Sequence, residues 1–109
     1  MPRLVRLAHD ARAEAAIEAF GNQVRVAILG YLMEHGAHTR GEIADALGIA
    51  PPTTNNHLRS LVDAGLLRAT PAQALRGSRP RYEVEPERVV ELYQALGVAL
   101  RLPPNAPQK

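Results

Sequence analysis

The stretch APPTTNNHLRSLVDAGLL, residues 50–67, carries its polar and apolar side chains in different halves. Pro51 and Pro52 open it, four small polar residues follow, and the second half is apolar up to Gly65. Proline is well tolerated in the first turn of a helix, because the backbone N–H that it lacks has no partner there. The stretch therefore predicts a helix that begins at the prolines and ends before Gly65.

The predicted helix has two distinct faces when its residues are placed at 100° intervals. Leu58, Leu61 and Val62 share one face, and Thr54 lies at its edge. The opposite direction and the flanks carry hydrogen-bonding side chains: Thr53, Asn56 and Ser60 opposite, and Asn55, His57 and Arg59 on the flanks. This pattern predicts a helix anchored in the core by its second half and able to enter a DNA major groove with its first half.

A second short helix is predicted directly before this one. Thr39 and Glu42 form a capping box, in which each side chain accepts from the other residue's backbone N–H. The helix behind the box ends at Gly48, and only a short turn separates it from Pro51. Two short helices joined by a turn that contains glycine, the second with a polar leading end, are typical of a helix-turn-helix.

The chain before residue 39 predicts two further helices. Residues 4–20 are rich in alanine and end at Gly21. Asn22 is a suitable N-cap for the next helix, which should end at Gly36.

The chain after Gly65 predicts two strands that form a hairpin. Residues 66–69 and 81–85 have the pattern of short strands, and the segment between them is polar and broken by Pro and Gly. Its tip contains Arg76 and Arg79, which suit DNA phosphates or a minor groove. The predicted fold class is therefore mainly α (α+β): a winged helix-turn-helix with a two-stranded β wing and additional N- and C-terminal helices.

Basic residues concentrate around the predicted recognition helix and wing. The chain has a net charge of only +2, yet five arginines and a single acid, Asp63, lie within residues 55–81. A local basic surface on a nearly neutral protein indicates a polyanionic partner, here double-stranded DNA, although a solvated arginine face would give the same pattern. The candidate DNA-binding residues are Thr53, Thr54, Asn55, Asn56, His57, Arg59, Ser60, Arg68, Arg76, Arg79 and Arg81.

Residues 19–85 resemble the winged helix-turn-helix of ArsR-type bacterial transcription regulators. The resemblance rests on NQVRVAIL, EIADALGI, NNHLRSLVDAGLL and the aromatic Tyr82 of the returning strand. It implies a homodimer that binds an inverted repeat at a promoter, usually as a repressor, with Thr53, Asn55, Asn56 and His57 in the DNA-contacting stretch. Two positions depart from the family pattern: Ala50 stands where a serine cap is frequent, and Gln23 stands where proline is frequent.

The resemblance also implies dimerisation through the first and last helices. The predicted last helix, residues 86–102, has more apolar side chains than a short terminal helix needs for its own core contacts. The candidate dimer-interface residues are Leu4, Leu7, Ala11, Val89, Leu92, Tyr93, Leu96 and Leu100.

No metal ion and no other cofactor is predicted. Many ArsR-type relatives sense metals through a cysteine pair or through Asp and His of the last helix, and this chain has no cysteine and no histidine in residues 86–102. His35 and His38 flank the Gly36 turn, but two nitrogens alone make a weak zinc site.

Other classes of protein find little support in the sequence. No continuous apolar run suits a membrane span or a signal peptide, so a cytoplasmic location is expected. The sequence contains neither a phosphate-binding glycine loop nor a nucleophile with a plausible base, so it does not indicate an enzyme.

Two alternatives stay open: a DNA-binding accessory factor of a mobile element, acting in recombination or replication, and a winged helix that binds protein. Residues 1–102 are expected to form one domain, and residues 103–109 a disordered tail.

Overall fold

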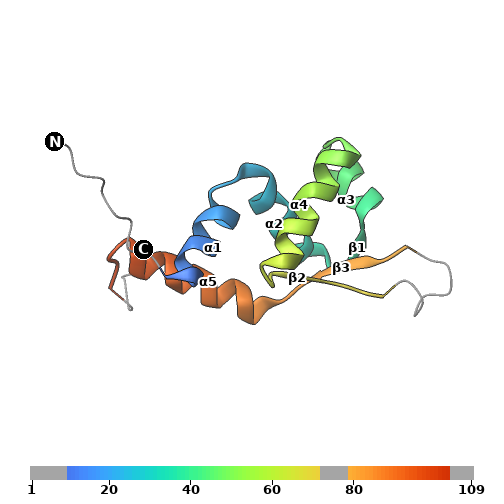
Figure 1. Ribbon diagram of the computed structural model, residues 1–109. Helices are drawn as coiled ribbons and strands as arrows, with labels where there is room; N and C mark the ends of the chain where they lie inside the picture. The colour runs from blue at the N-terminus through green and yellow to red at the C-terminus, as the bar shows by residue number, and fades with distance from the viewer. Residues whose placement is uncertain (1–9, 72–78, 104–109) are drawn as a thin grey trace.

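The computed structural model describes residues 10–71 and 79–103. Five helices and three short strands follow one another as α1 (Ala11–Phe20), α2 (Gln23–His35), β1 (His38–Thr39), α3 (Arg40–Leu47), α4 (Pro51–Asp63), β2 (Leu67–Ala69), β3 (Arg81–Val84) and α5 (Pro86–Ala99). The protein is therefore mainly α with a small antiparallel sheet, as predicted (Figure 1).

The predicted helix caps are present. Asn22 accepts a hydrogen bond from the backbone N–H of Arg25 at 3.1 Å and begins α2. At the start of α3, Thr39 accepts from the N–H of Glu42 at 3.2 Å, and Glu42 accepts from the N–H of Thr39 at 2.9 Å. Each of these bonds satisfies a backbone donor that the first helical turn leaves without a partner.

The turn between α3 and α4 begins at Gly48, where the sequence predicts that the first of the two helices ends. Gly48 adopts a left-handed conformation with φ of 67°, which glycine reaches without steric cost. Two residues later Ala50 caps α4 without a side-chain bond, and Pro51 and Pro52 form its first turn. α3 and α4 are thus the two helices of a helix-turn-helix.

One hydrophobic core holds the recognition helix in place. Leu58 and Leu61 of α4 are fully buried, together with Ile28 of α2, Ile43 of α3 and Leu92 of α5. Burial of each such side chain contributes roughly 1.5–3 kcal/mol relative to its exposure. Three other helices, α2, α3 and α5, therefore share this core with the second half of α4, and the leading end of α4 lies beside α3, away from α5 (Figure 1).

The sheet has one strand more than was predicted. Its order is β1-β3-β2, and both pairs are antiparallel, with Leu67 opposite Val84 and Thr39 opposite Arg81. β2 and β3 form the predicted two-stranded wing, and β1 was not predicted because it has just two residues, too few to show an alternating pattern. The two predicted strands are each one residue shorter, since Leu66 and Glu85 lie outside the ladder.

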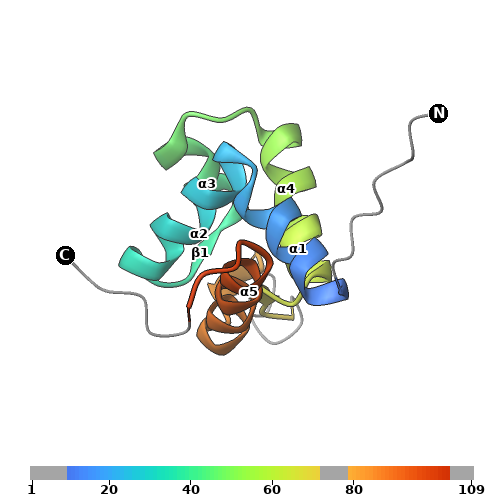
Figure 2. The same cartoon turned by 90° about the vertical axis from the view of Figure 1, so that its left-hand side faces the viewer.

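α1 and α5 lie side by side at the other end of the molecule (Figures 1 and 2). Residues 4–9 of the predicted first helix lie outside the described residues, where Leu4 and Leu7 also fall. α5 ends at Ala99 rather than at residue 102, because Leu100 is its C-cap and Arg101 turns the backbone to a φ of 65°. Within the described part of the chain, no helix is long and apolar enough to cross a membrane.

Candidate nucleic-acid interface

The first half of α4 presents its polar side chains outside the core. Thr53 and Asn56 are exposed, whereas Leu58 and Leu61, in the second half, are buried. An amide side chain and a threonine methyl group on an exposed leading turn are suited to contact base edges in a major groove. The division between a polar leading half and an apolar second half is therefore present in three dimensions.

Thr54 is the exception among the candidate residues of this helix. Its side chain is fully buried, and its hydroxyl donates a 3.0 Å hydrogen bond to the carbonyl oxygen of Ala50. A buried hydroxyl that bonds its own helix cannot reach a base. The assignment of Thr54 to the DNA-binding residues was wrong: its position at the edge of the apolar face places it in the core.

One flank of α4 faces α3. Asn55 is half-buried, and its side-chain oxygen accepts a 3.4 Å hydrogen bond from the guanidinium of Arg40. Arg40 is exposed and is the first residue of α3, directly after the N-cap Thr39. It was absent from the predicted set of DNA-binding residues. It adds a positive charge beside the leading end of α4.

The other flank of α4 faces α2. Arg25 donates from Nε to Nδ1 of His57 at 3.0 Å and from Nη2 to the hydroxyl of Ser60 at 3.3 Å. Burial and the nearby Arg25 charge both hold the pKa of His57 below its usual value. Arg25 was also absent from the predicted set, because a contact between residues 32 positions apart leaves no local signal in the sequence.

The predicted arginines differ in how many carboxylates surround them. Arg68 pairs with Glu83 and Glu85, and Arg81 lies 3.6 Å from Glu42 and donates to the carbonyl of Ala37 at 3.3 Å. Arg59 and Arg79 are exposed and form no ion pair with a described residue. Arg76 lies outside the described residues.

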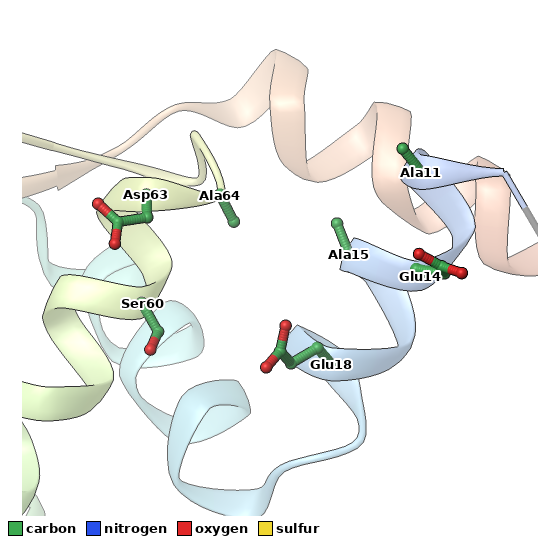
Figure 3. A pocket seen from close by; sticks show the side chains of 7 residues that line it. All are labelled: Ala11, Glu14, Ala15, Glu18, Ser60, Asp63 and Ala64. Carbon is green, nitrogen blue, oxygen red and sulfur yellow. The ribbon is translucent and has the colours of Figure 1, made fainter.

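A cleft beside the C-terminal half of α4 is lined by carboxylates. It has a volume of about 420 Å³ and lies between α1 and the end of α4 (Figure 3). Glu14 and Glu18 line it from α1, and Ser60 and Asp63 line it from α4. A phosphate backbone would be repelled by this surface. Electrostatics therefore favour DNA at the leading end of α4 rather than at its C-terminal end.

The rings of His35 and His38 both lie close to the ring of Tyr31. The ring centroids are 4.6 Å apart for Tyr31 and His35 and 5.2 Å apart for Tyr31 and His38. Nδ1 of His38 lies 2.8 Å from the carbonyl oxygen of Gly36, so this nitrogen acts as a donor there and cannot also bind a metal. Among the described residues, no group of three or more His, Cys, Asp or Glu side chains is arranged to hold a metal ion.

One residue of α5 that was predicted to lie in the dimer interface is buried inside the chain. Leu92 is fully buried in the protein's own core, so its assignment to the interface was wrong. Val89 and Leu96 are half-buried against the same core, and Ala11 and Leu100 are exposed. The exposed large apolar side chains near this end are Ile17, Val90, Tyr93, Val98, Leu100 and Leu102.

Comparison with known proteins agrees with this geometry. A family model described as a helix-turn-helix domain matches residues 20–70, from the end of α1 to the residue after β2. The chain has the winged helix-turn-helix fold of ArsR-family regulators. Solved structures with this fold are described as transcriptional regulators. No curated protein sequence matches the chain significantly.

Several solved structures share this winged helix-turn-helix fold. An ArsR family transcriptional regulator is 23% identical, with a TM-score of 0.65 over 83% of this chain and 88% of that chain. The antimony-specific transcriptional repressor AntR is 23% identical, with a TM-score of 0.63 over 92% of this chain and 87% of that chain. The homodimeric DNA-binding domain of a possible ArsR-family regulator from Mycobacterium bovis is 27% identical, with a TM-score of 0.62 over 83% of this chain and 79% of that chain.

Proposed function

We propose that this winged helix-turn-helix protein acts as a homodimeric transcriptional repressor that binds an inverted repeat in double-stranded DNA. The observation that carries the proposal is the division of α4. Leu58 and Leu61 fix its second half in the core, while Thr53 and Asn56 are exposed on its leading turns beside Arg40 and Arg59.

In this proposal the leading end of α4 enters the major groove. Asn56 would pair with an adenine, and the methyl group of Thr53 would contact a thymine methyl. Arg59 and Arg79, which are exposed, would contact phosphates and so fix the register of the protein on the duplex. The wing, of which β2 and β3 are the described part, would lie along the backbone next to the major groove.

Homodimerisation is supported by the apolar surface at the end of α5. Tyr93, Val98 and Leu100 are 69%, 73% and 60% exposed, so the C-terminal half of α5 leaves large apolar side chains uncovered. One structural neighbour is a homodimeric domain, which supports the same arrangement here. A two-fold axis through this surface would present two copies of α4 to DNA, and half-sites about one helical turn apart, or a multiple of it, would follow.

The repressor role and the cytoplasmic location belong to the same proposal. The neighbour AntR is a transcriptional repressor, and a regulator that binds a promoter blocks transcription most directly by occupying it. We also propose that residues 1–102 form one domain, as expected from the sequence.

The experiment that tests the proposal is selection of bound duplexes from a random pool, followed by sedimentation of the complex. We expect enrichment of an inverted repeat and a complex of two chains per duplex. A selected site without two-fold symmetry would reject the dimeric arrangement. Mapping the selected sequence to recombination or replication sites rather than promoters would favour the accessory factor, and no enrichment at all would favour a module that binds protein.

A further inference from the structure

Arg25 links α2 to the recognition helix through two hydrogen bonds. Its Nε donates to Nδ1 of His57 at 3.0 Å, and its Nη2 donates to the hydroxyl of Ser60 at 3.3 Å. The side chain of Arg25 is only 16% exposed, and its guanidinium also lies 3.8 Å from the carboxylate of Glu18 on α1. The planar fork of an arginine holds both bonds to α4 in one fixed geometry, which the flexible ammonium group of a lysine does not provide.

The bond from Arg25 determines which nitrogen of His57 carries the proton. A guanidinium has donors only, so Nδ1 of His57 must be an acceptor and must be unprotonated. A neutral imidazole then carries its proton on Nε2. Burial and the charge of Arg25 lower the pKa of His57, which keeps the ring neutral.

The position of His57 on α4 places its ring next to the proposed major-groove face. His57 follows Thr53 by four residues, so the two side chains lie one above the other, about 40° apart around the helix axis. Its ring is half-buried rather than enclosed. The nitrogen that does not bond Arg25 is therefore the one available to a ligand on this side of α4.

We infer that Arg25 is a positioning residue that fixes His57 with its Nε2–H as a donor toward a hydrogen-bond acceptor on DNA. This inference rests on the proposed function. The acceptor is either N7 of a guanine in the major groove or a phosphate oxygen, and both require the same donor. Arg25 itself does not contact DNA in this arrangement, and it acts through the tautomer and orientation of His57.

The first measurement uses the protein without DNA. Long-range ¹H–¹⁵N correlation spectra report directly which ring nitrogen of each histidine is protonated. We expect His57 of the wild-type protein to be protonated on Nε2 at neutral pH, and Arg25→Lys and Arg25→Ala to give a mixture of both tautomers. Arg12→Lys, which changes an exposed arginine of α1 paired with Asp10, is the matched control and should leave the His57 signals unchanged. Wild-type His57 protonated on Nδ1 would overturn the inference.

The second measurement uses the duplex that the wild-type protein selects. Arg25→Lys and His57→Ala should each weaken binding to this duplex about tenfold, and the double variant should be no weaker than His57→Ala alone, because both changes remove one interaction. Additive losses would overturn the inference. Circular dichroism and urea unfolding of Arg25→Lys, the conservative variant, separate this effect from loss of the fold.

Modified duplexes identify the acceptor. Replacement of a guanine by 7-deazaguanine removes N7, and a methylphosphonate removes a charged phosphate oxygen. If one of these modifications weakens binding of the wild-type protein but not of His57→Ala, it names the atom that His57 contacts. If neither does so, His57 donates to no base N7 or phosphate tested, and the inference fails at this step. Selection of no duplex at all would reject the proposed function, while the spectra of the free protein would still decide whether Arg25 sets the tautomer.

Discussion

Leu92 and Tyr93 are adjacent in the chain, but the side chain of Leu92 lies inside the protein and that of Tyr93 lies on its surface. Leu92 is fully buried in the core, whereas Tyr93 is 69% exposed. The helix turns by 100° between them, which carries one side chain into the core and the other to solvent. Substitutions at these two positions therefore separate the stability of one chain from its association with a second.

We expect Tyr93→Asp to dissociate the homodimer without unfolding the chain. A charge at an exposed position costs little in the monomer, but it would be buried without a partner in the dimer. Sedimentation over a range of protein concentrations measures this change. Leu92→Ala is the comparison: it should lower the free energy of unfolding by roughly 2–5 kcal/mol, as loss of a core leucine does. A wild-type protein that sediments as a monomer at micromolar concentration would contradict the dimer.

Asn56→Ala should weaken specific binding far more than nonspecific binding. The loss should be roughly 1–3 kcal/mol on the selected duplex and close to zero on a scrambled one, because a base contact carries the sequence information. Arg79→Ala should weaken binding to both duplexes and reduce the salt slope by about one unit, since it removes one phosphate contact. Binding titrations over a salt series distinguish the two. The roles of helix and wing are reversed if Arg79→Ala instead alters sequence preference.

Arg59→Ala and Arg68→Ala should have different effects on DNA binding. Arg59 is exposed on α4 and forms no ion pair with a described residue, so its loss should weaken binding and reduce the salt slope by about one unit. Arg68 is paired with Glu83 and Glu85, whose charges offset its own, and its loss should change affinity little. The same salt series measures both variants. An equal effect of the two would show that Arg68 leaves its carboxylates to bind phosphate.

Thr54→Val should lower the free energy of unfolding by about 1 kcal/mol. The substitution removes the buried hydrogen bond to Ala50, whose carbonyl still accepts from the backbone N–H of Thr54 at 2.9 Å. Urea unfolding measures the loss. Thr53→Val at the exposed neighbouring position is the matched control and should change stability by no more than about 0.5 kcal/mol. A larger loss of stability for Thr53→Val than for Thr54→Val would mean that Thr54 is not in the core.

The stability of the protein should fall in mild acid because of His57. Its pKa in the folded chain is below the ordinary value of about 6.5, so the unfolded chain binds a proton more readily. The stabilisation is fully present above the unfolded pKa and is lost as the pH falls toward the folded one. Urea unfolding of the wild type and of His57→Gln at pH 7.5 and 5.5 isolates this contribution. We expect the wild type to lose more stability than the variant, and equal losses would contradict it.

The sequence alone determined the local features of the fold. The capping box of Thr39 and Glu42, the end of α3 at Gly48 and the prolines at the start of α4 each depend on a few neighbouring residues, so the sequence pattern predicted them. The 3.6-residue period also identified the apolar face of α4. The same period placed Thr54 at the edge of that face, where the structure buries it.

The tertiary structure decided the features that depend on distant residues. The strand β1 exists only because β3 pairs with it, and Leu92 is in the core rather than on the surface because other helices pack against its side of α5. Likewise, Arg68 meets carboxylates across the sheet, and Arg25 meets His57 across 32 residues of chain. Contacts of this kind arise from packing between elements, which local periodicity and capping do not encode.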